Sequence, residues 1–219
     1  MLWHVWQRVR RCQQIGAVYI ATDSEELLAV ARGWGGAVLV TSRHCSSGTD
    51  RIASVVSQLP GDFIINVQAD EPLLDPAVLD ALIDAWRATG ADLITPVCRL
   101  VRVEDLKDHK VVKVARSGSG DAIYFSRSPI PAVRGVPLSR WLERHQFWRH
   151  VGIYGYRREV LARYRQLPRS DLETVESLEQ LRWIDAGYRI ATVEVSHQPT
   201  AVDSADDLAR LALEAEIVR

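Results

Sequence analysis

Residues 63–72 read Phe-Ile-Ile-Asn-Val-Gln-Ala-Asp-Glu-Pro, and this stretch decides which fold the sequence predicts. Its first half is a β-rich run that is too apolar for a half-exposed strand, so it predicts a strand buried on both faces. Ligands in open α/β sheets bind beyond the carboxyl ends of such strands. Asp70 and Glu71 follow at that end, and adjacent carboxylates suit a hard cation such as Mg²⁺. A capped acidic turn before the next helix explains the same residues, and both interpretations stay open here.

Strands and helices alternate on either side of this stretch. Three more β-rich apolar runs predict strands at 17–22, 37–41 and 91–97. Helical periodicity predicts helices between the strands, at about 1–13, 25–34, 50–58 and 76–89. The cap of the second helix is expected at Asp23-Ser24. Strands that are apolar on both faces and separated by helices predict a mostly parallel sheet with helices on both sides.

The alternation changes after residue 100. Residues 111–115 and 123–125 predict a hairpin with Ser117-Gly118-Ser119-Gly120 as its turn, and three prolines then mark an irregular loop. We therefore expect an inserted lobe over about residues 100–148. Beyond the lobe, the pattern predicts a strand at 151–157, a helix at 171–186, a strand at 189–195 and a helix at about 203–217.

The composition is that of a globular protein. The 219 residues are 47% hydrophobic and 25% charged, and the net charge of -1 argues against binding of nucleic acid or of a membrane surface through bulk charge. Three widely spaced cysteines form no C-x-x-C motif, which fits a reducing compartment, and no apolar run is long enough to span a membrane. We expect a cytoplasmic protein. The sequence also lacks the Walker A motif and the G-x-S-x-G motif, which disfavours P-loop NTPases and α/β-hydrolases.

Several other polar segments could bind a ligand. Residues 46–51 (Ser-Ser-Gly-Thr-Asp-Arg) join a predicted strand to a helix, where backbone N–H groups can face an anion or a base edge, although a Ser N-cap explains them without a ligand. His150 and Tyr154 would share one face of a strand while the residues between them pack inward, which suits either a wall that binds a polyol or a core histidine. Arg127 could hold a carboxylate or phosphate in bidentate fashion, or it could be solvated.

Two acidic segments nearer the C-terminus are equally ambiguous. Asp203 precedes a predicted helix, and it is either the N-cap, with Asp206 reaching back, or a second metal carboxylate beside Asp70. Residues 172–182 predict an amphipathic helix whose glutamates face water. Its core face would hold Leu172, Val175, Leu178 and Leu181.

Taken together and in this order, these segments resemble the 3-deoxy-manno-octulosonate cytidylyltransferase family. The resemblance covers nearly the whole chain, and it is carried by ATD at 21–23, SGTDR at 47–51, NVQADEP at 66–72, YFSRSPIP at 124–131, HVGIYGYR at 150–157, LEQLR at 178–182 and VD at 202–203. It implies a single domain over residues 1–219 with a three-layer α/β/α nucleotidyltransferase fold, similar to nucleotide-diphospho-sugar transferases. The sheet would be mostly parallel, and the small inserted lobe would form a homodimer.

The resemblance also implies a reaction and a role for each site residue. The anomeric hydroxyl of 3-deoxy-manno-octulosonate (Kdo) would attack the α-phosphate of CTP, giving CMP-Kdo and pyrophosphate for lipopolysaccharide synthesis. Asp70 and Asp203 would be the catalytic carboxylates that hold Mg²⁺, and Arg127 would pair with the Kdo carboxylate. The other implied roles are in binding: Gln68, His150, Tyr154, Glu179 and Gln180 to the sugar hydroxyls, and Ser47, Gly48, Thr49 and Arg51 to the nucleotide.

Two departures from the family pattern carry expectations of their own. Ala69 stands where the family usually has Gly, a mild change if the backbone φ there is negative. The family's first strand and basic loop, whose Arg and Lys grip the CTP triphosphate, have no counterpart before Met1. We therefore expect a truncated domain with an exposed sheet edge. Either the natural enzyme is longer than this sequence, or the truncation is real and the product is inactive or unstable.

Other functions stay open at this stage. A GT-A glycosyltransferase also places an acidic metal motif after a strand, and Asp70-Glu71 could play that part. Arg127, His150 and Tyr154 suit a free sugar acid better. A non-catalytic remnant that only dimerises would account for the missing loop. A cytidylyltransferase for sialic acid or another sugar acid is the remaining alternative.

Overall fold

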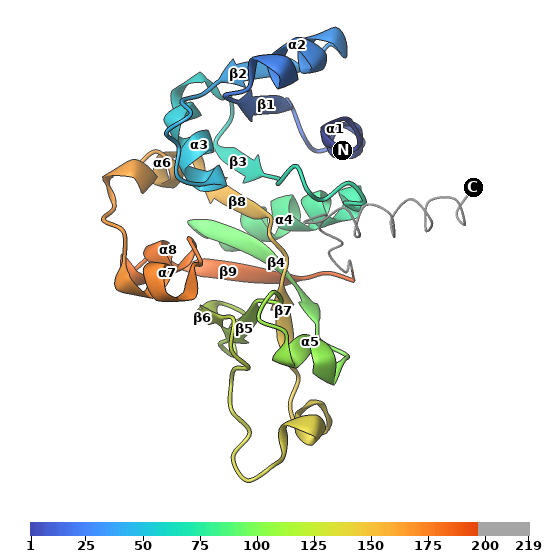
Figure 1. Cartoon of the computed structure of the whole chain (residues 1–219), viewed down its shortest axis with the longest axis vertical. Coiled ribbons are helices and arrows are strands. Elements are labelled where there is room, and N and C mark those ends of the chain that lie inside the picture. The colour runs from blue at the N-terminus through green and yellow to red at the C-terminus, as the bar shows by residue number, and fades with distance from the viewer. Residues whose placement is uncertain (197–219) are drawn as a thin grey trace, which may run out of the picture.

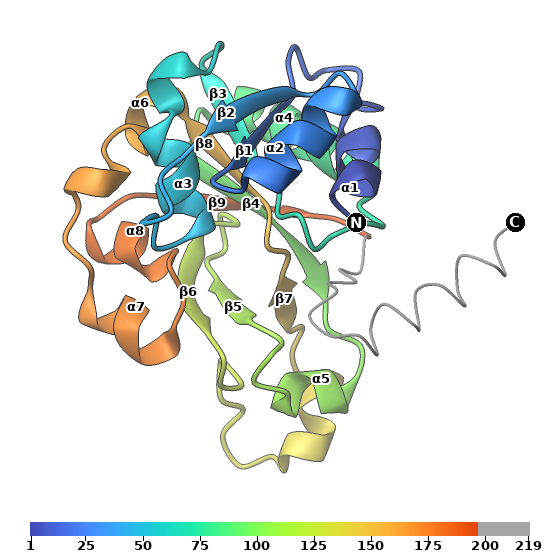
Figure 2. The same cartoon turned by 45° about the horizontal axis from the view of Figure 1, so that its top comes forward.

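The computed structural model describes residues 1–196, and these form two sheets flanked by helices (Figures 1 and 2). The smaller sheet pairs β1 (Tyr19–Thr22) in parallel with β2 (Ala37–Val40). The larger sheet has the strand order β3-β8-β4-β7-β5-β6, with β9 paired to β4. Its strands are β3 (Phe63–Asn66), β4 (Leu93–Arg99), β5 (Lys113–Arg116), β6 (Ala122–Ser126), β7 (Trp148–His150), β8 (Tyr154–Arg157) and β9 (Ile190–Glu194).

Helices connect the strands, and those of the first half of the chain lie where the periodicity predicts them. The first half of the chain holds α1 (Leu2–Val9), α2 (Glu25–Gly33), α3 (Gly48–Ser54) with the 3-10 turn η1 (Val56–Gln58), and α4 (Pro76–Thr89). The second half holds α5 (Val103–Lys107), η2 (Leu138–Glu143), α6 (Arg158–Leu161), η3 (Tyr164–Gln166), α7 (Asp171–Glu176) and α8 (Leu181–Asp185). The predicted cap at Ser24 is confirmed, because its side chain accepts a hydrogen bond from the backbone N–H of Leu27. No helix in residues 1–196 is long and apolar enough to cross a bilayer.

The expectation of a mostly parallel sheet is wrong. Within residues 1–196, parallel pairing is confined to β1 with β2 and to β4 with β9, and the other pairings are antiparallel. The reason is topological. The chain returns from the lobe and inserts β8 between β3 and β4, so the two strands that α4 joins are not neighbours. An apolar run reports burial on both faces, and it carries no information on strand direction.

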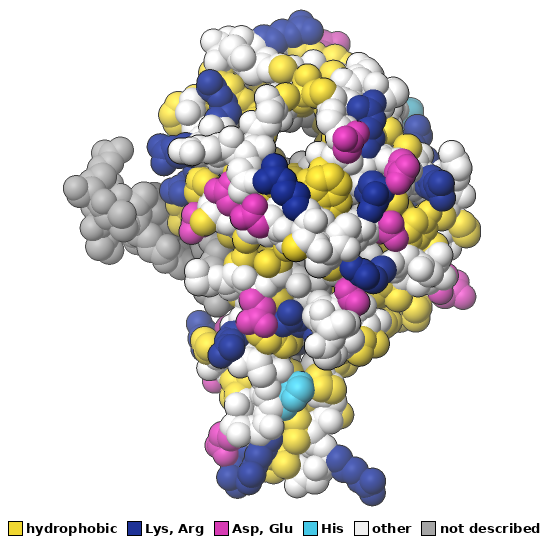
Figure 3. Space-filling model, turned by 180° about the vertical axis from the view of Figure 1, so that it is seen from behind, with side chains coloured by type: hydrophobic (Ala, Val, Ile, Leu, Met, Phe, Trp, Pro, Cys, Tyr) yellow, Lys and Arg dark blue, Asp and Glu magenta, His cyan; other side chains and the backbone are white. Residues whose placement is uncertain are grey.

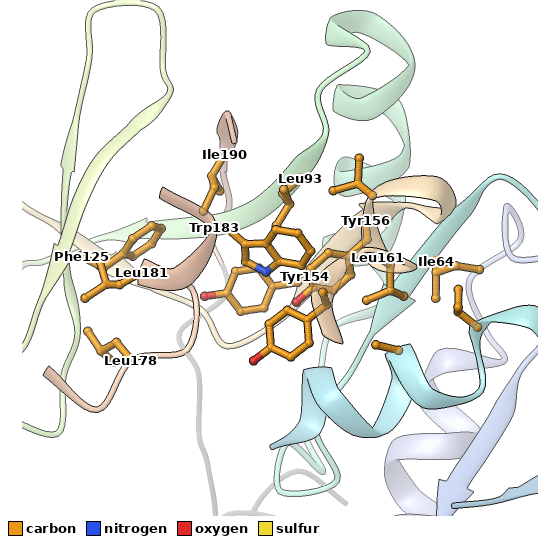
Figure 4. Close-up of a cluster of buried hydrophobic side chains, with 14 of the residues drawn as sticks. Ile64, Leu93, Phe125, Tyr154, Tyr156, Leu161, Leu178, Leu181, Trp183 and Ile190 are labelled. Carbon is orange, nitrogen blue, oxygen red and sulfur yellow. The ribbon is translucent and has the colours of Figure 1, made fainter. Parts of the chain in front are cut away.

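Strand β4, in the middle of the larger sheet, is buried on both faces, as its apolar run predicts. Successive β4 residues point to opposite sides, with Leu93 in one apolar cluster and Ile94 in another. Figure 4 shows the first cluster, where Trp183 of α8 packs beside Tyr154 and Tyr156 of β8. The second cluster is formed with α1 and α4 on the opposite face. The described residues therefore form helix, sheet and helix layers.

The region of residues 100–148 carries the predicted hairpin and a small core of its own. β5 and β6 pair antiparallel, and Gly120 in the turn between them has φ +87, which favours glycine. Leu106 of α5 and Phe147 are fully buried, and they pack with partly buried apolar residues of η2. The hairpin joins the larger sheet through β7, and the loop between β6 and β7 forms the lowest part of Figure 1.

The two sheets share no strand pairing. Among the described residues, β1 pairs only with β2 and β3 pairs only with β8. Seen from behind, the surface has an opening at the level of this gap (Figure 3). Helix α1 links the two parts, since Val5 packs in the cluster that holds α4 whereas Trp6 packs against Ile20 of β1. Among the described residues, β1 and β3 therefore each have a strand partner on one side only, and the expected truncation stays a prediction.

The single helix expected at 171–186 is wrong. Ser177 adopts a left-handed conformation with φ 52, so α7 ends before it and α8 begins only at Leu181. The break turns the expected core residue Val175 outward, 83% exposed, and Leu172 is also exposed, whereas Leu178 and Leu181 are buried as expected. Glu173, expected to face water, is buried and forms a bidentate ion pair with Arg182 at 2.6 and 2.7 Å.

The single strand expected at 151–157 is also interrupted. β7 ends at His150 and β8 begins at Tyr154. Between them, Val151 and Ile153 are buried, and the N–H of Ile153 bonds back to the carbonyl of Val151. The helix expected at 203–217 lies outside the described residues.

Gly155 is required where β8 passes between its neighbours. An added Cβ would lie 2.1 Å from Phe63 Cζ on β3 and 2.9 Å from Ile94 Cγ2 on β4. Phe63 cannot easily move away, because its ring stacks on Trp86 with a centroid distance of 4.4 Å. We expect Gly155→Ala to lower the free energy of unfolding by about 1–3 kcal/mol in urea denaturation.

Gly152→Ala is the matched control for this substitution. An added Cβ at Gly152 meets nothing within 4 Å, so we expect its free energy of unfolding to stay within about 0.5 kcal/mol of wild type. Equal stability of the two variants would contradict the close packing of β3, β8 and β4.

Candidate active site

The larger sheet brings two predicted site segments together at the carboxyl end of β3. Asn66, the last residue of β3, pairs with Tyr154, the first residue of β8. Gln68 and the half-buried Asp70 follow Asn66 along the chain. The N-cap of the next helix is Asp75, whose carboxylate accepts a backbone N–H hydrogen bond at 3.0 Å. Asp75, and not Asp70, is therefore the N-cap of α4, and the choice between an acidic turn and a metal-binding carboxylate at Asp70 stays open.

Asp70 has the chemistry that Mg²⁺ requires. Mg²⁺ is commonly held by one or two carboxylates together with substrate phosphates and water. Within residues 1–196 no cluster of three or more His, Cys, Asp or Glu side chains forms a closed metal cage. The second predicted ligand, Asp203, lies outside the described residues. The Asp70 carboxylate at the strand end thus fits a metal that is bound mainly through a nucleotide.

The turn before α3 lies directly against the end of β3. An added Cβ at Gly48 would lie 2.8 Å from Gln68 Nε2 and 3.1 Å from its Oε1, so the side-chain amide of Gln68 occupies the space that a larger residue would need. The Ser47 hydroxyl caps α3 by accepting a hydrogen bond from the N–H of Asp50, which confirms the N-cap interpretation of this turn. Ala69 has no positive φ, since Ser177 is the one non-glycine residue with φ above zero in the described part, so the Gly-to-Ala departure is mild.

Thr49 and Arg51, both predicted to bind the nucleotide, point to different places. Thr49 is buried, and its hydroxyl lies 2.9 Å from Glu179 Oε1 and 3.1 Å from the Tyr156 hydroxyl. Arg51 forms a 2.8 Å ion pair with Asp23 and also donates to Thr41 Oγ1. It therefore ties α3 to the ends of β1 and β2. Binding of the nucleotide by either side chain stays a prediction.

His150 and Tyr154 are adjacent, although not through strand alternation. Their rings lie 5.1 Å apart by centroids, across the break between β7 and β8. The His150 Nε2 atom lies 3.0 Å from the Thr95 hydroxyl. Burial, with a smaller effect from the charge of Arg149, lowers the pKa of His150 to about 3. The imidazole is therefore neutral at physiological pH, and it can donate and accept hydrogen bonds.

Three predicted sugar-binding residues each carry a buried polar atom that lacks a hydrogen-bond partner within the described residues. These atoms are the Tyr154 hydroxyl, Glu179 Oε2 and Gln180 Nε2. Burial, then the charges of Tyr156 and Glu179, raises the pKa of Tyr154 well above its ordinary value, so the phenol stays protonated. A buried polar atom without a partner costs about 1–3 kcal/mol. Two donors and an acceptor in this state indicate a site for a ligand rich in hydroxyl groups.

Arg127 is held in place by backbone carbonyls. Its guanidinium donates to the carbonyl oxygens of Glu176, His109 and Ser177 at 2.8, 3.0 and 3.2 Å. The Glu176 carboxylate in turn accepts from the Arg127 backbone N–H at 2.9 Å and from the Ser126 hydroxyl at 2.6 Å. These bonds use three of the five guanidinium N–H donors and hold the side chain in place. The other two N–H donors take no part in these three bonds. Pairing with a carboxylate stays a prediction.

Three residues that shape this site were missed at the level of sequence. Lys113 is fully buried, and its ammonium group donates to the carbonyls of Asp108, Val111 and Arg127. These bonds tie the loop of residues 108–111 to the backbone of Arg127. Thr95 interrupts the apolar run of β4 and bonds to His150, and Tyr156 bonds to Thr49. A polar residue inside an apolar strand was the available signal in each case, although it does not reveal the partner.

Comparison with known proteins gives a consistent family. A family model described as Cytidylyltransferase matches residues 1–190. The "3-deoxy-manno-octulosonate cytidylyltransferase" of Geotalea daltonii is 39% identical over 95% of this chain and 85% of its own length. The protein of the same name from Myxococcus xanthus is 40% identical over 96% of this chain and 84% of its own. A solved structure of CMP:2-keto-3-deoxy-manno-octonic acid synthetase complexed with CTP superposes with a TM-score of 0.91, at 35% identity, over 98% of this chain and 87% of its own.

His150 makes a specific contribution to acid stability. Its folded-state pKa of about 3 lies below the ordinary value of 6.5, so the unfolded chain binds a proton in this range that the folded chain does not. Stability is therefore lost as pH falls below about 6.5. Between pH 7.0 and 5.5 we expect this residue to lower the free energy of unfolding by about 1.2 kcal/mol, a loss that His150→Gln should not show. Urea denaturation of both proteins at the two pH values measures it, and an identical pH dependence would contradict a neutral His150.

Proposed function

The chain belongs to the 3-deoxy-manno-octulosonate cytidylyltransferase family, and from that premise we propose that it transfers CMP from CTP to Kdo, giving CMP-Kdo and pyrophosphate for lipopolysaccharide synthesis. The observation that carries the proposal is the group of buried, unpartnered polar atoms on Tyr154, Glu179 and Gln180. Kdo is a polyol acid whose hydroxyl groups would satisfy both the donors and the acceptor. Gln68, a predicted sugar-binding residue, lies against the Gly48 turn, which we propose as the cytosine site.

The reaction exchanges one phosphoryl bond for another. The oxygen of the Kdo anomeric hydroxyl forms a bond to the α-phosphorus of CTP as the bond to the bridging β-phosphate oxygen breaks. The hydroxyl proton is lost, and pyrophosphate leaves. The protein contributes chiefly by holding the two substrates in line, because fixed geometry removes the entropy cost of their encounter. The contact between Gln68 and Gly48 supports sugar and nucleotide sites that lie next to each other.

We propose Mg²⁺ as the cofactor, with Asp70 and Asp203 as its protein ligands. Asp70 lies at the end of β3, and Asp203 lies outside the described residues. When bound, the metal would neutralise charge on the triphosphate. The place of Asp70 after the carboxyl end of β3, where ligands bind in open α/β sheets, supports this role.

Arg127 and His150 account for selection of a sugar acid. The Arg127 guanidinium is held by the carbonyls of Glu176, His109 and Ser177, so little side-chain freedom remains to be lost when it pairs with a carboxylate. The neutral imidazole of His150 suits a hydroxyl group better than a second anion. The family match sets aside the glycosyltransferase alternative, whereas the identity of the sugar acid is decided by turnover.

Turnover is tested by pyrophosphate release from CTP and Mg²⁺ with either Kdo or N-acetylneuraminic acid. Two forms of the wild-type protein are compared, the chain as it stands and a chain extended by the strand and basic loop that the resemblance places before Met1. We expect release with Kdo from at least one form. Asp70→Asn should lower kcat by about 100-fold or more, because the carboxylate acts where charge develops on the phosphates.

Asp84→Asn is the matched control for Asp70→Asn, since Asp84 is an exposed carboxylate on α4 outside the site. It should keep wild-type kcat. Folded protein that releases no pyrophosphate in either form would overturn the proposed function and favour a non-catalytic remnant. Release with N-acetylneuraminic acid alone would overturn the choice of Kdo.

We also propose that the chain forms a homodimer through the lobe of residues 100–148. Two large apolar side chains of this lobe face solvent, Val101 at 74% and Ile123 at 58% exposure. Burial of such residues against a second copy would stabilise an association. We expect sedimentation velocity to show a dimer that Ile123→Glu converts to monomer, whereas Val40→Glu on β2 should leave it dimeric. A wild-type monomer at micromolar concentration would contradict this proposal.

The proposed compartment is the cytoplasm, which is reducing. Cys12, Cys45 and Cys98 are free thiols, two of them buried. Burial raises the pKa of the Cys98 thiol to about 11, so it stays protonated and unreactive in the core. Free thiols of this kind are typical of reducing compartments.

A further inference from the structure

Thr49 is shielded from any ligand, although its neighbours in the chain form the turn proposed for the nucleotide. The residue is 1% exposed and lies at the second position of α3. Its hydroxyl reaches across 130 positions of sequence to Glu179 Oε1 at 2.9 Å, and it lies 3.1 Å from the Tyr156 hydroxyl. A side chain enclosed in this way cannot read a base edge directly.

The directions of these two hydrogen bonds follow from their chemistry. A carboxylate oxygen only accepts, so the single proton of the Thr49 hydroxyl points to Glu179. The Tyr156 hydroxyl must then donate to Thr49 Oγ1. Burial and the nearby charge of Glu179 raise the pKa of Tyr156 well above its ordinary value, so the phenol keeps the proton that it donates. The result is an ordered chain of donors that ends on one oxygen of Glu179.

The other oxygen of Glu179 belongs to the group of unpartnered atoms. Glu179 lies on the turn between α7 and α8, after the left-handed Ser177. A Glu side chain on such a turn has several rotamers, and one hydrogen bond to a rigid helix restricts them. With Oε1 held by Thr49, Oε2 is the buried acceptor left without a partner among the described residues.

We propose that Thr49 is a positioning residue for the sugar substrate: its hydroxyl fixes the Glu179 carboxylate so that Oε2 accepts a hydrogen bond from a sugar hydroxyl. The inference rests on the proposed function, and it moves Thr49 from the nucleotide side of the site to the sugar side. The start of α3 then serves both substrates. Its turn at Gly48 lies at the proposed nucleotide site, and its Thr49 orders Glu179 at the proposed sugar site.

Thr49→Val tests this role, because valine keeps the shape and removes the hydroxyl. Steady-state pyrophosphate release is measured with each substrate varied in turn. We expect KM for Kdo to rise about 5- to 10-fold, the effect of loosening one charged hydrogen-bond acceptor, while KM for CTP changes less than about twofold. Thr49→Ser restores the hydroxyl, and it should bring KM for Kdo back to within about twofold of wild type.

Tyr156→Phe separates positioning from stability. It removes the other partner of the Thr49 hydroxyl and leaves the bond to Glu179 in place. We expect its melting temperature to fall about as far as that of Thr49→Val, with KM for Kdo near wild type. An equal rise of KM for Kdo in both variants would mean that Thr49 acts only through core stability, which overturns the proposal.

A double-substitution cycle tests whether Thr49 acts through Glu179. In a Glu179→Ala background, Thr49→Val should raise KM for Kdo no further, since the carboxylate that it positions is gone. Additive effects, or a rise of KM for CTP alone, would overturn the proposal and return Thr49 to the nucleotide site. If the wild-type chain does not turn over Kdo, the proposed function itself is overturned. If the wild type does turn over Kdo and Thr49→Val leaves KM for Kdo unchanged, only this inference is overturned.

Discussion

The antiparallel insertion of β8 between β3 and β4 is the constraint on which the rest of the structure depends. It places Tyr154 opposite Asn66, so the residues after β3 and the residues at the start of β8 meet at one edge of the sheet. The close approach of three strands is possible because Gly155 has no side chain against Phe63 and Ile94. A larger residue there would displace β8 and separate the two halves of the site.

The candidate site combines side chains that are held in place with buried polar atoms that lack a hydrogen-bond partner among the described residues. Arg127, Glu179 and His150 are each held by a partner, through three carbonyls, the Thr49 hydroxyl and the Thr95 hydroxyl respectively. Tyr154 and Gln180 present buried donors without a partner in the part of the chain that the structure describes. Fixed side chains beside unsatisfied polar atoms are the arrangement that binds a polar ligand without a large loss of conformational entropy.

The break at Ser177 shows why the sequence predicted this region only in part. The spacing of Leu172, Val175, Leu178 and Leu181 favours one helix, and every residue in it tolerates helical backbone. The left-handed residue instead lets Glu173 pair with Arg182, and it sends Glu179 toward Thr49. A buried bidentate pair and a buried carboxylate–hydroxyl bond favour the turn, and neither partner lies at helical spacing. The family resemblance predicts a sugar-binding role for Glu179 and Gln180, whereas periodicity alone predicts that the glutamates of this segment face water.

The sequence by itself determined the order of strands and helices up to β4, the burial of β4 on both faces, the β5–β6 hairpin, the Ser24 and Ser47 caps and the family. These features depend on residue type and local spacing, which report burial and backbone preference along the chain. Only the tertiary structure decided the direction of β8, the split of the helix at Ser177 and the bond from Thr49 to Glu179. Their energies come from contacts between residues far apart in sequence, so a local pattern holds no record of which partner each residue meets or from which direction a strand arrives.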